Sequence, residues 1–345
     1  MNTIFCLVSR QAMANVLPVL MYKPKNVVLF ITPEEKKSAD NLEKLFKSKD
    51  FNVLRKDNLN AYNYVAFKDV VKNELSKFQE DVWLNVTGGT KLMALAAYEA
   101  FVEKDRNIIY CNTENNEIIY LFPELKTEPL KLNLTINDYL YAYGYKIIEH
   151  KESLSEGDYF NLFDFVEKYN LMYSLVNLYR KVRQKLAKNV PKFSLHSEDR
   201  KICFNKNFDN FSLRYGKQQE YSFKVQSSDF KSGDWLEYYI CYKLKNTANL
   251  NPLAGVKIIN PQGVENEIDV VVLKDFRLFI YSCKTGKIDN QYDLYQLETL
   301  RNITSGTFGK GIFVTTNRHS QKFLDRANEL SVNVINVTQN NSKFI

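Results

Sequence analysis

The stretch from Asn85 to Lys91 reads Asn-Val-Thr-Gly-Gly-Thr-Lys, which predicts a strand that ends, a glycine turn and a helix that begins. Such a junction directs free backbone N–H groups and the positive end of a helix dipole towards one place. The missing Cβ atoms also let a phosphate or a nucleotide come close. Ordinary turn chemistry before a helix is the alternative explanation. The order Thr90 before Lys91 excludes a Walker A loop, and no GxGxxG sequence is present.

The residues around this junction alternate between β-branched runs and amphipathic stretches. We expect strands at 3–8, 27–32, 82–86 and 108–111, and helices at 33–49, 62–78 and 90–103. This alternation implies right-handed crossovers and a buried parallel sheet. Ser9, Arg10 and Gln11 follow the first strand, at the carboxyl edge where ligands of open parallel sheets bind. They are candidate donors to a ribose or a base, or simply a helix cap.

The C-terminal half has a different order of elements. We expect a helix at 235–245, a strand at 256–260, a hairpin at 267–283, a helix at 292–303, a strand at 311–315, a helix at 320–330 and a strand at 332–337. This order, αβββαβ followed by αβ, predicts a mixed sheet. Helices over 158–186 are interpreted as a connector, and the polar stretch 196–226 as a small irregular β layer. The α/β chain is therefore divided into residues 1–145, 146–195 and 196–345.

Composition places the chain among proteins that bury a core. Of its 345 residues, 45% are apolar and 14% aromatic, and no run approaches the roughly 18 apolar residues of a membrane helix. The five cysteines are odd in number and form no CxxC pair, and no secretory signal is apparent. We therefore expect a cytoplasmic protein with no membrane partner. Three histidines without metal-ligand spacing argue against a zinc hydrolase, and GxSxG is absent.

The positive charge is unevenly distributed. Residues 1–150 carry 19 basic and 19 acidic side chains, whereas residues 151–345 carry 28 and 21, so the whole net charge of +7 lies in the second part. A basic surface attracts polyanions such as nucleic acid. A solvated lysine-rich surface is an equally acceptable interpretation.

The predicted hairpin at 267–283 brings together the polar side chains that most strongly indicate a chemical function. A two-residue turn at Asp275 and Phe276 would place Asp269 opposite Ser282, with Lys284 on the same face. Glu267 would lie beside them. A carboxylate and a lysine on an otherwise apolar hairpin are costly unless they are paired or functional. The simpler explanation is a plain ion pair.

The first half resembles the CRISPR-associated Rossmann-fold (CARF) sensor domain. The resemblance rests on Ser-Arg-Gln after the first strand and on Asn-x-Thr-Gly-Gly-Thr-Lys-x-Met at 85–93, and it covers about residues 1–145. It implies a homodimer that binds cyclic oligoadenylate, the messenger of type III CRISPR complexes, across the dimer axis. The implied ligand-binding residues are Ser9, Arg10, Gln11, Thr87, Gly88, Gly89, Thr90, Lys91, Asn112 and Thr113.

The second half resembles the PD-(D/E)xK restriction-endonuclease superfamily and, over 230–345, the nuclease domain fused to CARF sensors. The resemblance implies that Asp269 and Glu237 hold Mg²⁺ or Mn²⁺ and that Lys284 orients the nucleophile and stabilises the developing charge. Gln296 or Gln291 would be a further contact. The family pattern is acidic-x-Lys, but this chain has Ser282-Cys283-Lys284, so a hydroxyl replaces a ligand carboxylate. Glu267 or Glu265 could supply the missing charge.

The expected function is a metal-dependent endonuclease of type III CRISPR antiviral defence, activated by cyclic tetra-adenylate, which cleaves DNA, single-stranded RNA or both. The alternative is a messenger-responsive nucleic-acid binder whose restriction-like domain lost its chemistry at Ser282. A third interpretation is a sensor that degrades its own messenger, although no base for that reaction stands out.

Overall fold

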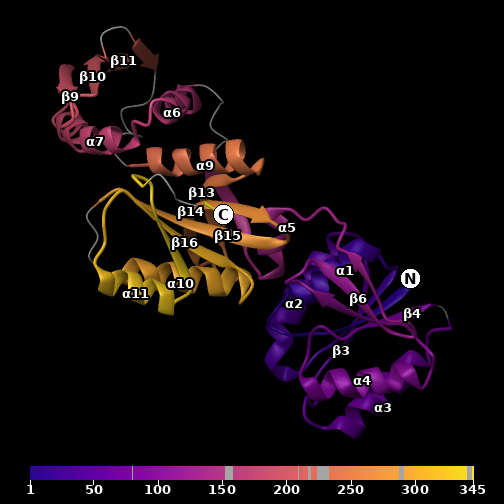
Figure 1. Cartoon of the computed structure of the whole chain (residues 1–345). Coiled ribbons are helices and arrows are strands. Elements are labelled where there is room, and N and C mark those ends of the chain that lie inside the picture. Colours follow the sequence, from indigo (N-terminus) through magenta and orange to yellow (C-terminus); the bar gives the residue numbers. More distant parts are fainter. Residues whose placement is uncertain are drawn as a thin grey trace.

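The structure is a computed structural model that describes residues 1–79, 81–151, 158–208, 210–216, 219–223, 233–286, 291–339 and 344–345. Within these ranges the chain forms three sheets, of seven, four and six strands (Figure 1). No helix in the described part of the chain has the length and apolar character needed to cross a bilayer.

The seven-stranded sheet has the order β3-β2-β1-β4-β5-β6-β7. Its strands are β1 (Thr3–Leu7), β2 (Asn26–Phe30), β3 (Asn52–Lys56), β4 (Val82–Asn85), β5 (Ile108–Asn112), β6 (Glu117–Phe122) and β7 (Lys126–Pro129). The first five strands in this order are parallel, as expected, whereas β6 and β7 pair antiparallel. β3, β6 and β7 were not predicted. The sequences of β3 and β7 are mixed and polar, whereas β6 has an apolar run that the sequence interpretation missed.

Helices cover both faces of this sheet (Figure 1). One face packs against α1 (Met13–Tyr22), α2 (Lys36–Lys47) and α5 (Ile136–Ala142), the other against α3 (Tyr64–Leu75) and α4 (Lys91–Val102). A short 3-10 turn, η1 (Pro33–Glu35), precedes α2. The central strand β1 is buried along its whole length, as expected for a strand covered on both faces.

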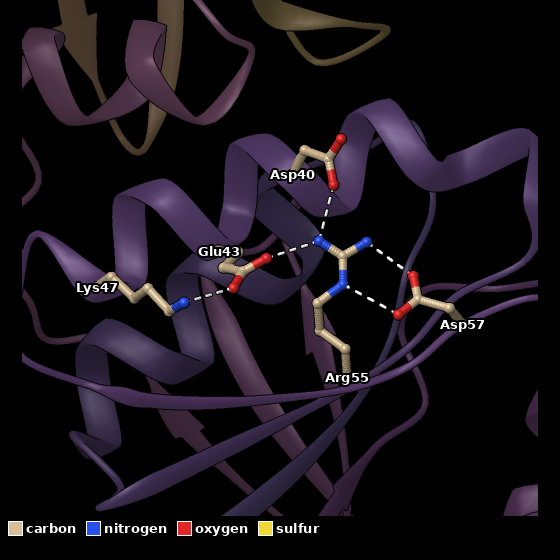
Figure 2. A network of polar contacts seen from close by, with 5 residues as sticks. All are labelled: Asp40, Glu43, Lys47, Arg55 and Asp57. Atoms are coloured by element: carbon tan, nitrogen blue, oxygen red, sulfur yellow. Dashed lines mark hydrogen bonds and ion pairs between the residues drawn. The ribbon is translucent and has the colours of Figure 1, made fainter.

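Arg55 fastens α2 to the edge strand β3 (Figure 2). Its guanidinium group lies 2.7 Å from Asp40, 2.6 Å from Glu43 and 2.7 Å from Asp57, and Glu43 also pairs with Lys47 at 2.6 Å. Hydrogen bonds from Lys47 and Arg55 hold the pKa of Glu43 below its usual value despite partial burial. The network holds α2 on the exposed edge of the sheet.

The six-stranded sheet has the order β17-β16-β15-β14-β13-β8. Its strands are β8 (Lys146–Lys151), β13 (Leu253–Ile259), β14 (Glu265–Lys274), β15 (Arg277–Lys284), β16 (Lys310–Thr315) and β17 (Val332–Asn336). The expected αβββαβ order is confirmed, and the sheet is mixed: β8 and β13 to β15 are antiparallel, and β15 to β17 are parallel. α9 (Trp235–Ala248) packs on one face, and α10 (Tyr292–Ser305) and α11 (Gln321–Glu329) pack on the other.

The described residues of 158–223 form a further group of elements, here called the middle unit, whose buried side chains belong to the same hydrophobic core as α9. It contains α6 (Asp158–Lys168), α7 (Met172–Ala187), β9 (Lys192–His196), β10 (Ile202–Asn207), β11 (Asn210–Tyr215) and β12 (Gln219–Phe223). The strands form a regular antiparallel sheet in the order β12-β11-β10-β9, where an irregular layer was expected. Both helices pack against it, and α6 also contacts α9.

The structure therefore divides the region expected to be a connector differently. Of the expected connector 146–195, β8 joins the six-stranded sheet, while α6, α7 and β9 belong to the middle unit. β8 could not be recognised because its partner, β13, lies about a hundred residues further along the chain. The apolar stripes of α6 and α7 do not show that these helices pack on the strands that follow them. In Figure 1 the middle unit lies beyond α9, on the side of the six-stranded sheet away from the N-terminal domain.

Candidate functional site

The β14–β15 hairpin sets the geometry of the C-terminal site. Val270 pairs with Tyr281, and Lys274 pairs with Arg277, which is the predicted register. The two turn residues, Asp275 and Phe276, both have positive φ (49° and 58°), as in the two-residue turns that match the twist of paired strands. This register brings Asp269 level with Ser282.

Asp269 is held by three donors from β15. Its Oδ2 atom accepts hydrogen bonds from the backbone N–H of Cys283 at 2.7 Å, from Lys284 Nζ at 3.4 Å and from Ser282 Oγ at 3.5 Å. Burial lowers the pKa of Lys284, but the nearby carboxylates of Asp269 and Asp293 more than compensate, so this pKa lies above its ordinary value. Lys284 therefore carries a positive charge at neutral pH.

Glu237 approaches Asp269 from α9, which packs on the face of the sheet opposite α10. Its Oε2 atom accepts a hydrogen bond from Lys151 Nζ at 3.0 Å, and Lys151 also pairs with Asp234 at 2.8 Å. Burial, and next the negative charge of Asp269, raise the pKa of Glu237 to about 7. Two carboxyl groups thus repel each other at one end of the sheet.

Lys151 is a site residue that the sequence interpretation missed. It lies on β8, the edge strand that was not predicted, and reaches Glu237 across β13. Gly255 makes room for it: a Cβ atom there would lie 2.7 Å from Lys151 Cε and 2.8 Å from Cδ. No local pattern links residues so far apart, so only the sheet order reveals the contact.

A cavity of about 450 Å³ opens beside the hairpin and α10. Its polar lining includes Asn266, Glu267, Asp269, Ser282, Lys284, Asp293 and Gln296. Glu267 and Gln296, both singled out in the sequence, thus share one cavity with Asp269, whereas Glu265 and Gln291 do not line it. Asp293 is a third carboxylate in the lining, and the sequence interpretation did not consider it.

The donor set is compatible with a hard divalent cation. Within the described residues, no three side chains among His, Cys, Asp and Glu converge as a ready-made metal cluster. Asp269 and Glu237 are nevertheless close enough for the charge of one to raise the pKa of the other, and a cation would relieve this repulsion. Mg²⁺ is commonly bound by one or two carboxylates while keeping several waters, so these residues fit such an ion.

The N-terminal candidates gather at the carboxyl ends of β1, β4 and β5. Thr87 Oγ1 donates to Asn85 Oδ1 at 2.5 Å and accepts from the backbone N–H of Cys111 at 2.7 Å. Thr90 caps α4 by accepting from Met93 N at 3.2 Å and donates to the Ala61 carbonyl at 3.0 Å. Both hydroxyl groups therefore already form hydrogen bonds within the domain.

Close packing against β1 explains why position 88 is a glycine. A Cβ atom at this position would lie 2.1 Å from the Leu7 carbonyl oxygen and 3.3 Å from Ser9 Oγ, so the turn packs directly on the end of β1. Ser9 therefore lies beside the glycine turn. The cations near this edge are exposed: Lys91 faces solvent, and Arg10, 86% exposed, lies 3.5 Å from Glu35.

Of the remaining candidates, Thr113 and Gln11 contact the C-terminal part of the chain. Asn112 organises the β5–β6 turn through Glu117, 2.9 Å away, and the Thr113 carbonyl accepts a hydrogen bond from Arg277 at 3.4 Å. Arg277 also bonds to the Glu114 carbonyl at 3.2 Å. Gln11 lies so close to Gly306 that a Cβ atom there would be 2.5 Å from Gln11 Oε1.

Comparison with known proteins identifies both domains. Residues 3–139 match the family model of the Card1 CARF domain, and residues 225–341 match that of the Card1-like endonuclease domain. The two ranges leave residues 140–224 between them. No curated protein matches the sequence.

Solved structures share this architecture over nearly the whole chain. Can2 from Sulfobacillus thermosulfidooxidans, in complex with cyclic tetra-adenylate, is 25% identical with a TM-score of 0.77, over 98% of this chain and 96% of Can2. The Vibrio cholerae protein VC1899 is 16% identical with a TM-score of 0.76, over 97% and 94%. A type III CRISPR defence DNA nuclease activated by cyclic oligoadenylate is 18% identical with a TM-score of 0.61, over 92% of this chain and 45% of that one. The chain therefore belongs to the CARF-domain nucleases, with a Card1-type CARF domain followed by a Card1-like endonuclease domain.

Proposed function

We propose that the chain is a metal-dependent nuclease of type III CRISPR defence, switched on by a cyclic oligoadenylate. The observation that carries the proposal is the grouping of Asp269, Ser282 and Lys284 on paired strands of the Card1-like endonuclease domain. Two relatives support it: Can2 is solved with cyclic tetra-adenylate, and another relative is a type III CRISPR nuclease activated by cyclic oligoadenylate. The proposed substrate is DNA, single-stranded RNA or both.

In this proposal Asp269 and Glu237 hold Mg²⁺ or Mn²⁺, and Glu267 in the cavity wall adds negative charge. The bound cation supplies charge neutralisation at a non-bridging phosphate oxygen and lowers the pKa of a water. Because Asp269 and Asp293 keep Lys284 protonated, this lysine acts as a donor that orients the nucleophile and stabilises the charge of the transition state. It does not act as a general base.

The N-terminal domain is the proposed sensor. The first N–H groups of α4 have no partner within the helix, so the glycine turn suits the phosphates of the messenger. Arg10 and Lys91 supply exposed positive charge at the same edge. Ser9, Thr87 and Asn112 complete the ligand site, and a homodimer would present this edge twice to a cyclic ligand.

Two contacts between the domains provide the proposed coupling. Arg277, at the turn of the catalytic hairpin, holds the β5–β6 loop through the carbonyls of Thr113 and Glu114. Gln11, after β1, lies against Gly306 at the end of α10. Both sensor segments are candidate ligand loops, and both of their partners belong to elements that line the cavity. A ligand that moves these loops therefore acts on the hairpin and on α10.

Messenger-dependent cleavage tests the proposal. Purified protein is incubated with labelled single-stranded RNA, single-stranded DNA or plasmid, with Mn²⁺ or EDTA, and with or without cyclic tetra-adenylate. We expect cleavage only when both messenger and cation are present. Equal cleavage with and without the messenger would refute activation by the messenger. Undiminished cleavage in EDTA would refute the requirement for a divalent cation.

Ser282 favours one other function, a messenger-responsive nucleic-acid binder without catalysis. A hydroxyl stands where the superfamily has a carboxylate, and no three metal-ligating side chains converge among the described residues. The Ser282→Glu variant separates the two functions. Cleavage that appears only in this variant would favour the binder, whereas wild-type cleavage that is lost in Asp269→Ala would favour the nuclease.

A further inference from the structure

The middle unit holds most of the excess positive charge of the chain. Residues 158–223 contain 12 Lys and Arg against 7 Asp and Glu, a net charge of +5 within a chain of net charge +7. This unit lies between the two ranges matched by the family models. Neither model therefore assigns it a role.

Several of its described acidic side chains are exposed but are held by contacts within the protein. Asp164 accepts a hydrogen bond from Tyr242 at 2.6 Å, Glu167 pairs with Lys243 at 3.1 Å, and Asp199 accepts from Ser197 at 2.6 Å. By contrast, none of the Lys and Arg residues in the described part of the unit forms an ion pair. The positive charge of this surface is therefore not neutralised within the protein.

Several cations lie on the exposed side of α7 and at its C-cap, Lys188. Leu175, Leu178, Val182 and Leu186 are buried on the side towards the middle sheet. Arg180, Arg183, Lys185 and Lys188 are exposed, and we call these four residues the α7 basic face. It extends over about 12 Å, since eight residues of helix rise 1.5 Å each.

Hydrogen bonds connect this face to the candidate active site. The guanidinium of Arg180 donates to Asn317 Oδ1, and Asn317 Nδ2 donates to the carbonyl of Gly286 at 2.5 Å. Gly286 comes two residues after Lys284, in the segment that leaves β15. Arg180, at one end of the α7 basic face, therefore lies near the end of the sheet where Asp269 and Lys284 meet.

We propose that the α7 basic face binds the phosphate backbone of the nucleic-acid strand on one side of the cleavage site. This inference rests on the proposed nuclease function and adds a substrate-binding surface to it. Contacts to phosphates carry no sequence information, so the face holds RNA and DNA strands alike. Each phosphate contact adds about 0.7 to the slope of log affinity against log salt for a single strand.

The test measures binding in a cleavage-deficient background. Full-length Asp269→Asn protein is titrated into fluorescein-labelled 20-nucleotide RNA or DNA, and fluorescence polarisation is followed at several salt concentrations. The comparison variant adds Arg183→Gln, Lys185→Gln and Lys188→Gln; Arg180 is kept because it bonds to Asn317. We expect at least tenfold weaker binding of both strands and a salt slope smaller by about 2.

A matched control removes the same charge elsewhere. Lys37→Gln, Lys44→Gln and Lys104→Gln alter three exposed lysines of the sensor domain, and we expect wild-type binding from this variant. Arg183→Lys keeps the charge and should also bind normally. Equal binding by the α7 variant and the control, or no binding by the Asp269→Asn parent, would overturn the inference. Wild-type protein that does not cleave, with the α7 effect present, would overturn the nuclease function alone.

Discussion

Replacing Glu237 with Gln tests the electrostatics of the candidate active site. Burial and the charge of Asp269 raise the pKa of Glu237 to about 7 from an ordinary value of 4.5. A carboxyl group with a raised pKa binds its proton more tightly in the folded chain than in the unfolded chain. Its contribution to stability is therefore fully present below about pH 4.5 and is lost as the pH rises through 7.

The expected change in stability follows from the size of the pKa shift of Glu237. At about 1.36 kcal/mol per pKa unit, the ionised Glu237 costs about 3 kcal/mol at pH 8 relative to its protonated form. Gln resembles the protonated form in shape and charge. In EDTA, Glu237→Gln should therefore raise the melting temperature by several degrees at pH 8 and leave it unchanged at pH 4.5.

The assay is thermal unfolding at both pH values, with and without Mn²⁺. The cation should stabilise the wild-type protein at pH 8 and stabilise Glu237→Gln much less, because one ligand carboxylate is gone. Glu265→Gln, an exposed carboxyl on the same sheet, is the control and should change neither value. If the Glu237→Gln protein is no more stable than wild type at pH 8, the conclusion that burial and Asp269 raise the pKa of Glu237 is refuted.

Three further substitutions separate the sensor, the coupling and the chemistry. Lys284→Met should lower messenger-stimulated cleavage by about 10²–10³-fold, because it removes a donor to the transition state, and cyclic tetra-adenylate binding by calorimetry should not change. Arg277→Ala should leave messenger binding intact but reduce the stimulation of cleavage by about tenfold, since two hydrogen bonds between the domains are lost; full stimulation would exclude this path. Gly88→Ala should destabilise the sensor by about 1–3 kcal/mol in chemical unfolding, because its Cβ would collide with the Leu7 carbonyl, and an unchanged midpoint would contradict that packing.

The sequence predicted most of the elements that carry the sites. β-Branched runs and turn residues were sufficient for β1, β2, β4, β5 and the β14–β15 hairpin, because burial on both faces leaves a clear apolar signal. The register of the hairpin followed from its two-residue turn, so the approach of Asp269 to Ser282 and Lys284 could be predicted. Local patterns determine such local geometry.

Long-range neighbours could not be predicted in this way. β8 is a short, polar edge strand whose pairing with β13 joins distant parts of the chain, so the contact of Lys151 with Glu237 left no sequence signal. The packing of the middle unit could not be predicted either, because the apolar stripes of its helices do not identify the sheet on which they pack. The contacts of Gln11 and Thr113 with the C-terminal part likewise depend on how the domains dock.

The most direct test of the central claim is the initial rate at which a labelled RNA or DNA strand is cut, with saturating cyclic tetra-adenylate and Mn²⁺, by wild-type and Asp269→Asn proteins. If the hairpin carboxylate holds the catalytic cation, the substitution should abolish cleavage to the limit of detection while messenger binding persists. Asp269→Asn protein that cuts at the wild-type rate would place the chemistry elsewhere in the chain.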